Sequence, residues 1–163
     1  MTGLEDRIAV HRGSALDIPF PDDTFDAVWM QNVGMNIADK RKLYGEICRV
    51  LKPGGRFAFQ EMAAGKVATS YFPLPWATDP ADNFLVSAEE MRSVLGEIGF
   101  IAELFEDTSD AHLSRTTANA TPAAPGQLGL AVFVDNLAQK AGNARRSLEE
   151  GQVRLVRGVF RVK

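Results

Sequence analysis

The sequence predicts an α/β fold built around an open sheet, and three successive segments lead to this prediction. Residues 27–30 are continuously apolar, which is typical of a strand covered on both faces in a parallel sheet. The apolar residues at 43, 47, 50 and 51 fall on one face of a helix. Residues 56–62 read as the next strand. Because such crossovers are right-handed, the two strands are expected to lie parallel in one sheet.

The N-terminal part is predicted to hold one more strand and a loop. Residues 8–11 form a short apolar run that ends in an Arg-Gly-Ser turn at 12–14. Pro19 and Pro21 then supply turn chemistry before the strand at residues 25–30. The predicted order is therefore strand, loop and strand.

The boundaries of the first helix are marked by local chemistry. Asp39 can cap its first turn, because an aspartate side chain accepts hydrogen bonds from the free N–H groups there. At the other end, Pro53 cannot continue the helix, and Gly54 and Gly55 permit the left-handed turn into the next strand. We expect the helix to end near residue 51.

A second helix is predicted over residues 87–98. Ser87 and Glu90 have the spacing of a capping box, and Gly99 ends the helix. Its apolar positions have helical spacing: Met91, Val94, Leu95 and Ile98. A strand at residues 101–106 is expected to follow.

The C-terminal third is predicted to contain a flexible loop, two helices and a strand. Residues 116–126 are rich in Thr, Ala and Pro and have no core-forming pattern. Residues 127–150 favour helix but break near Gly142 and Asn143, with a buried stripe on the first piece: Val134, Leu137, Ala138 and Ala141. Residues 156–162 alternate apolar and basic side chains, which indicates a strand with one solvated face, antiparallel and near an edge.

Composition narrows the class of protein. The chain of 163 residues has 18 Lys and Arg against 21 Asp and Glu, a net charge of −3. Such a balance does not favour binding to nucleic acid or to an anionic membrane, because both require clustered positive charge. The N-terminus has acidic residues where a secretory signal would have basic ones, and Cys48 is the single cysteine. We therefore expect a cytoplasmic protein with one domain over residues 1–163.

Three motifs resemble the class I S-adenosylmethionine-dependent methyltransferases in order and spacing. They are Gly-Ser-Ala-Leu-Asp-Ile-Pro-Phe at 13–20, Asp-Thr-Phe-Asp-Ala-Val at 23–28, and Glu-Ile-Cys-Arg-Val-Leu-Lys-Pro-Gly-Gly at 46–55. The nearest groups are small-molecule enzymes such as quinone C-methyltransferases and glycine/sarcosine-type N-methyltransferases. The resemblance covers residues 4 to about 106 and extends less firmly beyond them.

The resemblance implies a cofactor site for S-adenosylmethionine. In the family, the loop after the third strand holds the adenine, which assigns that role to Ser14, Ala15 and Leu16. Ser14 stands where the family commonly has an acidic residue, and its hydroxyl accepts a hydrogen bond more weakly than a carboxylate. Gln31 and Asn32 lie in the loop that passes under the methionine part and faces the methyl acceptor.

The resemblance also implies an incomplete Rossmann-like methyltransferase sheet. The family's first two strands and glycine-rich loop would precede residue 4, and no Gly-x-Gly-x-x-Gly occurs in the chain. Without that loop, the chain alone is expected to bind S-adenosylmethionine poorly. The strand at 25–30 would also keep an unpaired edge, so we expect a homo-oligomer or a partner that supplies the missing half.

Residues 63–86 form an aromatic and proline-rich stretch that is too long for a simple connector. Tyr71, Phe72 and Trp76 are candidates to bind the acceptor as part of a substrate lid, because aromatic faces attract a sulfonium and exclude water. Hydrophobic packing of an insertion explains the same residues equally simply. Gln60 and Glu61, at a predicted strand end, are further candidates for ligand contacts.

The remaining chemically active side chains have ordinary structural explanations. Asp26 starts a strand, where backbone N–H groups usually satisfy a carboxylate. His11 is read as a strand residue, His112 as a solvated histidine in a polar connector, and Cys48 as a packing residue of the first helix. Two separated histidines with no further ligand pattern predict no metal site.

The sequence therefore predicts methyl transfer from S-adenosylmethionine to a small-molecule amine, oxygen or activated carbon, impaired in this chain alone. Alignment of nucleophile, methyl and sulfur supplies much of the acceleration in such a reaction, which leaves a dedicated base optional. Accordingly, no catalytic residue is assigned. The alternative is a non-enzymatic methyltransferase-like subunit that self-associates or binds a protein partner through its strand edge.

Overall fold

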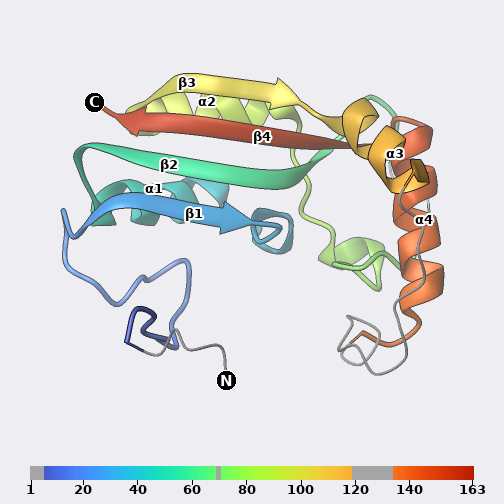
Figure 1. The fold of residues 1–163 in the computed structure, drawn as a ribbon, viewed down its shortest axis with the longest axis horizontal. Helices are drawn as coiled ribbons and strands as arrows, with labels where there is room; N and C mark the ends of the chain where they lie inside the picture. The colour runs from blue at the N-terminus through green and yellow to red at the C-terminus, as the bar shows by residue number, and fades with distance from the viewer. Residues whose placement is uncertain (1–5, 69–70, 119–133) are drawn as a thin grey trace.

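The computed structural model describes residues 6–68, 71–118 and 134–163. Within these ranges, four strands form one sheet in the order β1-β2-β4-β3 (Figure 1). The strands are β1 (Phe25–Gln31), β2 (Leu51–Ala64), β3 (Phe100–Asp107) and β4 (Val153–Val162). β1 and β2 are parallel, whereas β4 is antiparallel to both of its neighbours. The predicted α/β class and the parallel crossover are confirmed.

The helices are α1 (Lys40–Val50), α2 (Ala88–Ile98), α3 (Ser109–Ala118) and α4 (Leu137–Glu149), with short 3-10 turns η1 (Gly34–Asn36) and η2 (Pro80–Asp82). Helices α1 and α2 lie side by side on one face of the sheet (Figure 1). α3 and α4 pack together beyond one end of it. No helix in the described ranges is both long and apolar enough to cross a bilayer.

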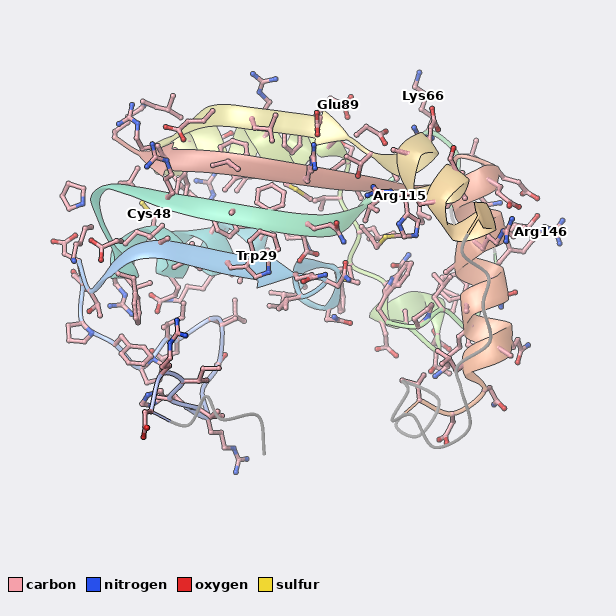
Figure 2. The ribbon with its side chains drawn as sticks, in the orientation of Figure 1. Trp29, Cys48, Lys66, Glu89, Arg115 and Arg146 are labelled. Carbon is pink, nitrogen blue, oxygen red and sulfur yellow. The ribbon has the colours of Figure 1, made fainter. Side chains whose placement is uncertain are left out.

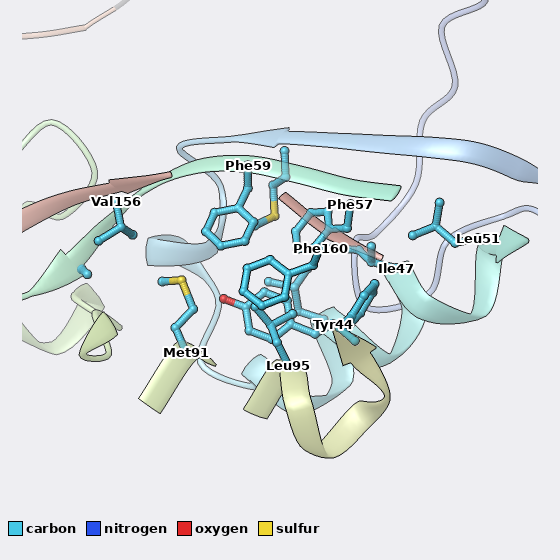
Figure 3. Close-up of a cluster of buried hydrophobic side chains, with 13 residues drawn as sticks. Tyr44, Ile47, Leu51, Phe57, Phe59, Met91, Leu95, Val156 and Phe160 are labelled. Atoms are coloured by element: carbon cyan, nitrogen blue, oxygen red, sulfur yellow. The ribbon is translucent and has the colours of Figure 1, made fainter. Parts of the chain in front are cut away.

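The main core lies between the sheet and the pair α1 and α2. Figure 3 shows its aromatic centre, where Phe57 and Phe59 of β2 meet Phe160 of β4 and Leu95 of α2. The rings of Phe59 and Phe160 stack with their centroids 5.7 Å apart. Each of these four side chains is at most 1% exposed, so this interface is a close-packed interior.

The predicted helix ends are confirmed. The side chain of Asp39 accepts a hydrogen bond from the Lys42 N–H at 2.8 Å and caps α1. Ser87 accepts from the Glu90 N–H at 3.1 Å and caps α2. α2 ends at Gly99, whose φ of 123° lies outside the range that other residues readily adopt.

β1 differs from the prediction that both of its faces are covered. Met30 is buried against the core, but Trp29 on the opposite face is 66% exposed (Figure 2). The strand register places Trp29, Ala58, Val159 and Leu104 in one row across this face. Within the described residues the row is uncovered because both α1 and α2 pack on the other side.

Residues 8–11 do not form the predicted strand. They have no regular structure, and Ile8 and Val10 are 57% and 92% exposed. An apolar run becomes a strand only when a neighbouring strand satisfies its backbone groups, and no described strand pairs with this segment.

The C-terminal third corrects further predictions. The connector that contains His112 is helical, as part of α3, and residues 116–118 complete that helix instead of opening the predicted loop; residues 119–126 lie outside the described ranges. α4 continues through Gly142 and Asn143 without a break, because its other side chains favour helix. Its buried side contains Ser147 and Leu148, whereas the predicted Ala138 and Ala141 are exposed.

β4 is antiparallel as predicted but lies inside the described sheet instead of near an edge. It pairs with β2 on one side and β3 on the other. Arg157 and Arg161 remain accessible because they point to the face that α1 and α2 leave open, where Arg157 pairs with Glu106. A solvated face therefore does not require an edge position.

Candidate functional site

A cavity of about 510 Å³ lies where the chain leaves β1, and five parts of the molecule build its wall. They are the turn after β1, the strands β2 and β4, the 75–76 segment, helix α3, and helix α4 with Val134 just before it. The lining residues are Asn32, Met35, Asn36, Gln60, Met62, Pro75, Trp76, His112, Val134, Leu137, Ala144, Leu148 and Leu155. The site thus sits beyond the carboxyl end of a parallel strand, where ligands of open α/β sheets bind.

Strand alternation decides which side chains of β2 reach the cavity. Gln60 and Met62 point to one face of the sheet, and Met62 stands opposite Leu155 of β4. Glu61 points to the other face and is 1% exposed. Neither residue ends the strand as predicted, because β2 continues to Ala64, and of the two Gln60 is among the described lining residues.

Glu61 instead accepts hydrogen bonds from the backbone of the turn after β1. Its Oε1 accepts a hydrogen bond from the Val33 N–H at 2.7 Å, and the Gly34 and Met35 N–H groups also favour its charged form. Burial outweighs these interactions and raises the pKa of Glu61. Gly34 lies so close that an added Cβ would stand 3.3 Å from Oε2 of Glu61. The carboxyl group therefore fixes the backbone that carries Asn32, Met35 and Asn36.

Lys40 secures the other end of the same turn. Its Nζ donates to the carbonyl oxygens of Gly34 at 2.8 Å, Phe84 at 2.7 Å and Ile37. Burial lowers the pKa of this ammonium group, and the charge of Glu61 opposes that effect. Through Phe84, Lys40 also ties the turn to the segment that precedes α2.

The predicted adenine loop forms a tight turn, in which Ser14 Oγ accepts from the Leu16 N–H at 3.1 Å. Ser14 is exposed, whereas Ala15 and Leu16 are half-buried and pack against the core. None of these residues is among the described lining of the cavity. They therefore lie on a part of the surface separate from the cavity wall.

A charged pair on α1 anchors the continuation of this loop. Glu46 Oε2 accepts from the Ile18 N–H at 2.9 Å, and Arg49 donates to the carbonyl oxygens of Ile18 and Phe20, both at 2.9 Å. Arg49 also pairs with Asp22 at 2.8 Å and with Glu46. The Arg49 guanidinium holds the pKa of Glu46 down at about 2. Glu46 and Arg49 of the third sequence motif thus fix the backbone of the first motif at residues 18–20.

The second predicted loop lies directly at the cavity. Asn32 follows β1 with a φ of 53°, and its N–H donates to the Gln60 carbonyl at 2.9 Å. Gln31 and Asn32 are both exposed, and Asn32 lines the cavity. The left-handed conformation turns the chain away from the sheet so that the Asn32 side chain reaches the site.

The three aromatic candidates separate in the structure. Trp76 lines the cavity, and its Nε1–H donates to Asn83 Oδ1 at 2.9 Å. Tyr71 donates its hydroxyl to Glu150 at 2.7 Å, and Arg146 lies over its ring at 4.1 Å. Neither Tyr71 nor Phe72 is among the described lining residues. Tyr71 therefore ties the segment to the C-terminal end of α4, and the substrate roles predicted for Tyr71 and Phe72 stay predictions.

The other candidate side chains have structural partners or surroundings. Asp26 pairs with Lys52 at 2.8 Å, and its own backbone N–H also favours its charged form. His11 contacts Phe20 edge to face at 5.0 Å, outside any strand. Cys48 is half-buried on α1 and packs against the core, and burial raises the pKa of its thiol (Figure 2). His112 is half-buried and lines the cavity.

Sequence reasoning missed the α4 side of the wall, although a signal was present. Leu137, Ala144 and Leu148 are spaced by seven and four residues, which places them on one helix face. The break assumed at Gly142 hid this continuous spacing. The contact between Glu61 and Val33 had no such signal, because it joins residues 28 positions apart.

Comparison with known proteins agrees with the motifs. Residues 2–59 match the family described as methyltransferase domain. The demethylmenaquinone methyltransferase of Symbiobacterium thermophilum is 51% identical over 53 residues, which are 32% of this chain and 21% of that protein. The dimethylglycine N-methyltransferase of Parasynechococcus marenigrum is 42% identical over 66 residues, which are 40% of this chain and 24% of that protein.

Solved structures extend the likeness to nearly the whole chain. A protein described as a sarcosine dimethylglycine methyltransferase from Galdieria sulphuraria is 25% identical with a TM-score of 0.70, and the match covers 98% of this chain and 61% of that one. The geranyl diphosphate C-methyltransferase of Streptomyces coelicolor, solved with S-adenosylhomocysteine, has a TM-score of 0.71 at 17% identity over 99% of this chain and 55% of its own. This chain therefore spans little more than half the length of these structures. The motifs and the fold of this chain are therefore similar to those of the class I S-adenosylmethionine-dependent methyltransferases of the small-molecule type.

Proposed function

We propose that the chain takes part in methyl transfer from S-adenosylmethionine to a small-molecule acceptor bound in the cavity of about 510 Å³. The observation that supports this function is the position of Asn32. It lies at the carboxyl end of β1, in the loop that by resemblance passes under the methionine part, and it also lines the cavity. One residue thus connects the cofactor loop with a space large enough for an organic molecule.

The described residues fit part of the cofactor. Ser14 is exposed and can exchange hydrogen bonds with the adenine amino group, while Ala15 and Leu16 offer apolar surface beside the ring. Glu46 and Arg49 hold the continuation of this loop in one position. The cofactor supplies an electrophilic methyl group on a sulfonium. The amide groups of Gln31 and Asn32 would orient its methionine part.

The chemistry required of the chain is mainly positioning. Methyl transfer needs the acceptor atom, the methyl carbon and the sulfur in line, and fixed side chains provide such alignment. Glu61 and Lys40 fix the turn that bears Asn32, Met35 and Asn36. The apolar wall of Met62, Trp76, Leu148 and neighbouring residues would exclude water from the reacting groups.

We propose further that the uncovered edge and face of β1 bind a second polypeptide segment, from another copy or from a partner that completes the cofactor site. Within the described sheet, β1 pairs with β2 alone, and Trp29 lies 66% exposed in the apolar row beside this edge. Unpaired strand edges and exposed aromatic side chains both favour association. Light scattering at tens of micromolar tests this. A dimer or larger assembly supports association, and a monomer contradicts the self-associating form.

Calorimetry with S-adenosylhomocysteine tests the cofactor site. The variant Asn32→Gly removes the side chain but keeps a residue that readily adopts the φ of 53°. The matched control is Asn136→Gly, since Asn136 has a φ of 54° but precedes α4, outside both cofactor loops. Because the family's glycine-rich loop is not among these residues, we expect weak but saturable binding, which Asn32→Gly weakens further and Asn136→Gly leaves unaffected. Absence of any saturable binding would refute the cofactor assignment for this chain and favour the non-enzymatic alternative.

A further inference from the structure

We propose that the methyl acceptor is a neutral, mostly apolar molecule with one hydroxyl or carbonyl end. This inference rests on the proposed function, because it assigns the occupant of the same cavity. The proposed function leaves the charge of the acceptor open, and this inference assigns a neutral one. The choice depends on which side chains form the wall and on what the nearest charged groups already bind.

Most of the described wall is apolar. β2 and β4 contribute Met62 and Leu155, the 75–76 segment contributes Trp76, and α4 contributes Leu137 and Leu148. Leu148 and Leu155 are each 5% exposed, so they present fixed surfaces instead of mobile surface side chains. An apolar molecule that leaves water for such a wall is stabilised by the hydrophobic effect.

No Lys, Arg, Asp or Glu occurs among the described residues that line this cavity. A phosphate or carboxylate group on the acceptor would lose its water without gaining a lysine or arginine partner. An ammonium group would likewise lack a carboxylate. Because burying an unpaired charge is strongly unfavourable, the wall selects against both kinds of acceptor.

Two arginines of α4 are already paired. Arg145, in the wall of an adjoining cavity, forms an ion pair with Glu149 at 2.8 Å. Arg146 pairs with Glu150 at 2.8 Å and covers the ring of Tyr71. Figure 2 shows Arg146 on the outer side of α4. Neither arginine is therefore placed to serve as a counter-ion inside the cavity.

The polar part of the described wall consists mainly of three amides, which sit at the β1 end, and of the His112 ring, which comes from α3. Asn32 and Asn36 come from the turn after β1, and Gln60 comes from the neighbouring strand, whose carbonyl accepts the Asn32 N–H. An amide side chain both donates and accepts hydrogen bonds, which matches a hydroxyl or carbonyl group. This end of the cavity adjoins the loop of Gln31 and Asn32, so the polar end of the acceptor would face the cofactor.

The apolar end of the acceptor has room to extend under α4. A second cavity of about 400 Å³ shares much of its wall with the first, including Met62, Leu137, Ala144 and Leu148. Ala144 is the smallest of these side chains and lies where the two spaces meet. An acceptor with an alkyl or ring system longer than the first cavity would follow this path.

Binding of three probes with the same octyl chain tests the inference. They are para-octylphenol, octyl phosphate and octylamine at neutral pH, which are neutral, anionic and cationic. The variant Trp29→Phe leaves Trp76 as the single tryptophan, so its fluorescence reports occupancy of the cavity. We expect para-octylphenol to bind at least about tenfold more tightly than either charged probe. Equal or tighter binding of a charged probe would overturn the inference.

Two substitutions in the same background locate the binding. Ala144→Phe fills the cavity and should abolish the fluorescence response, whereas Ala138→Phe, on the exposed side of α4, should leave it unchanged. Gln60→Lys places a cation in the wall and should shift selectivity toward octyl phosphate. Binding that survives Ala144→Phe would also contradict the inference. Because the probes bind without cofactor, this result is independent of the calorimetry with S-adenosylhomocysteine.

Discussion

Glu61 offers a direct test of how the turn at the cavity is held. Its Oε1 accepts the Val33 N–H at 2.7 Å, and no side chain of the turn itself caps η1. The variant Glu61→Gln keeps an acceptor oxygen and removes the charge, whereas Glu61→Leu removes the acceptor altogether. The difference between the two variants therefore isolates the hydrogen bond.

The expected size of this difference follows from burial. Leaving a buried donor unpaired costs about 1–3 kcal/mol, and Glu61, which is 1% exposed, faces the buried Gly34 and Met35 N–H groups as well as the part-buried Val33 N–H. We take about 2 kcal/mol, which corresponds to a melting temperature lower by about 4–8 °C in a chain of this size. Glu61→Gln should stay within about 0.5 kcal/mol of the wild type at neutral pH, because burial already disfavours the charged form.

Urea unfolding followed by circular dichroism measures both variants under identical conditions. The control is Glu103→Gln, since Glu103 is an exposed partner of Arg56 on β3 and should change stability little. Equal stability of Glu61→Leu and Glu61→Gln would refute the reasoning, because the acceptor oxygen would then contribute nothing. An equally large loss in both variants would show that the charge, and not the hydrogen bond, holds the turn.

Other predictions concern α1, α2 and β4. The pKa of Glu46 falls from 4.5 to about 2 on folding, so its stabilising effect is present above pH 4.5 and is lost as the pH falls toward 2. Between these two pH values, the melting temperature of Glu46→Gln should therefore depend less on pH than that of the wild type. Ser87→Ala removes the cap of α2 and should lower the free energy of unfolding by about 0.5–2 kcal/mol, measured in urea. Gly158→Ala places a Cβ 2.7 Å from the Phe59 ring and should destabilise by about 1–3 kcal/mol in the same assay, whereas an unchanged midpoint would show that the core yields.

The ends of helix α2 could be predicted from local sequence patterns alone. Ser87 and Glu90 marked its start, and Gly99 its end, because caps act through neighbouring backbone groups. The strands β1, β2 and β3 and the sequence motifs were identified for the same local reason. By contrast, helix α3 was missed, since its Ser and Thr residues carry little apolar periodicity.

The candidate site could be predicted only in part. Asn32, Gln60 and Trp76 were identified as ligand candidates, and all of them line the cavity. The roles of Ser14, Ala15 and Leu16 toward the cofactor stay predictions. Tyr71 had the same aromatic character as Trp76, but its hydrogen bond to Glu150 depends on where α4 packs. Composition alone does not separate a wall residue from a packing residue.

The sequence by itself determined closely where β1, β3, α1 and α2 begin and end, and which family the motifs resemble, because these depend on neighbouring residues. Only the tertiary structure decided that β4 lies between β2 and β3, that one face of β1 is open, and that Glu61 accepts the Val33 N–H. Those outcomes depend on backbone pairing and side-chain packing between segments far apart in the chain. Local periodicity carries no information about such partners.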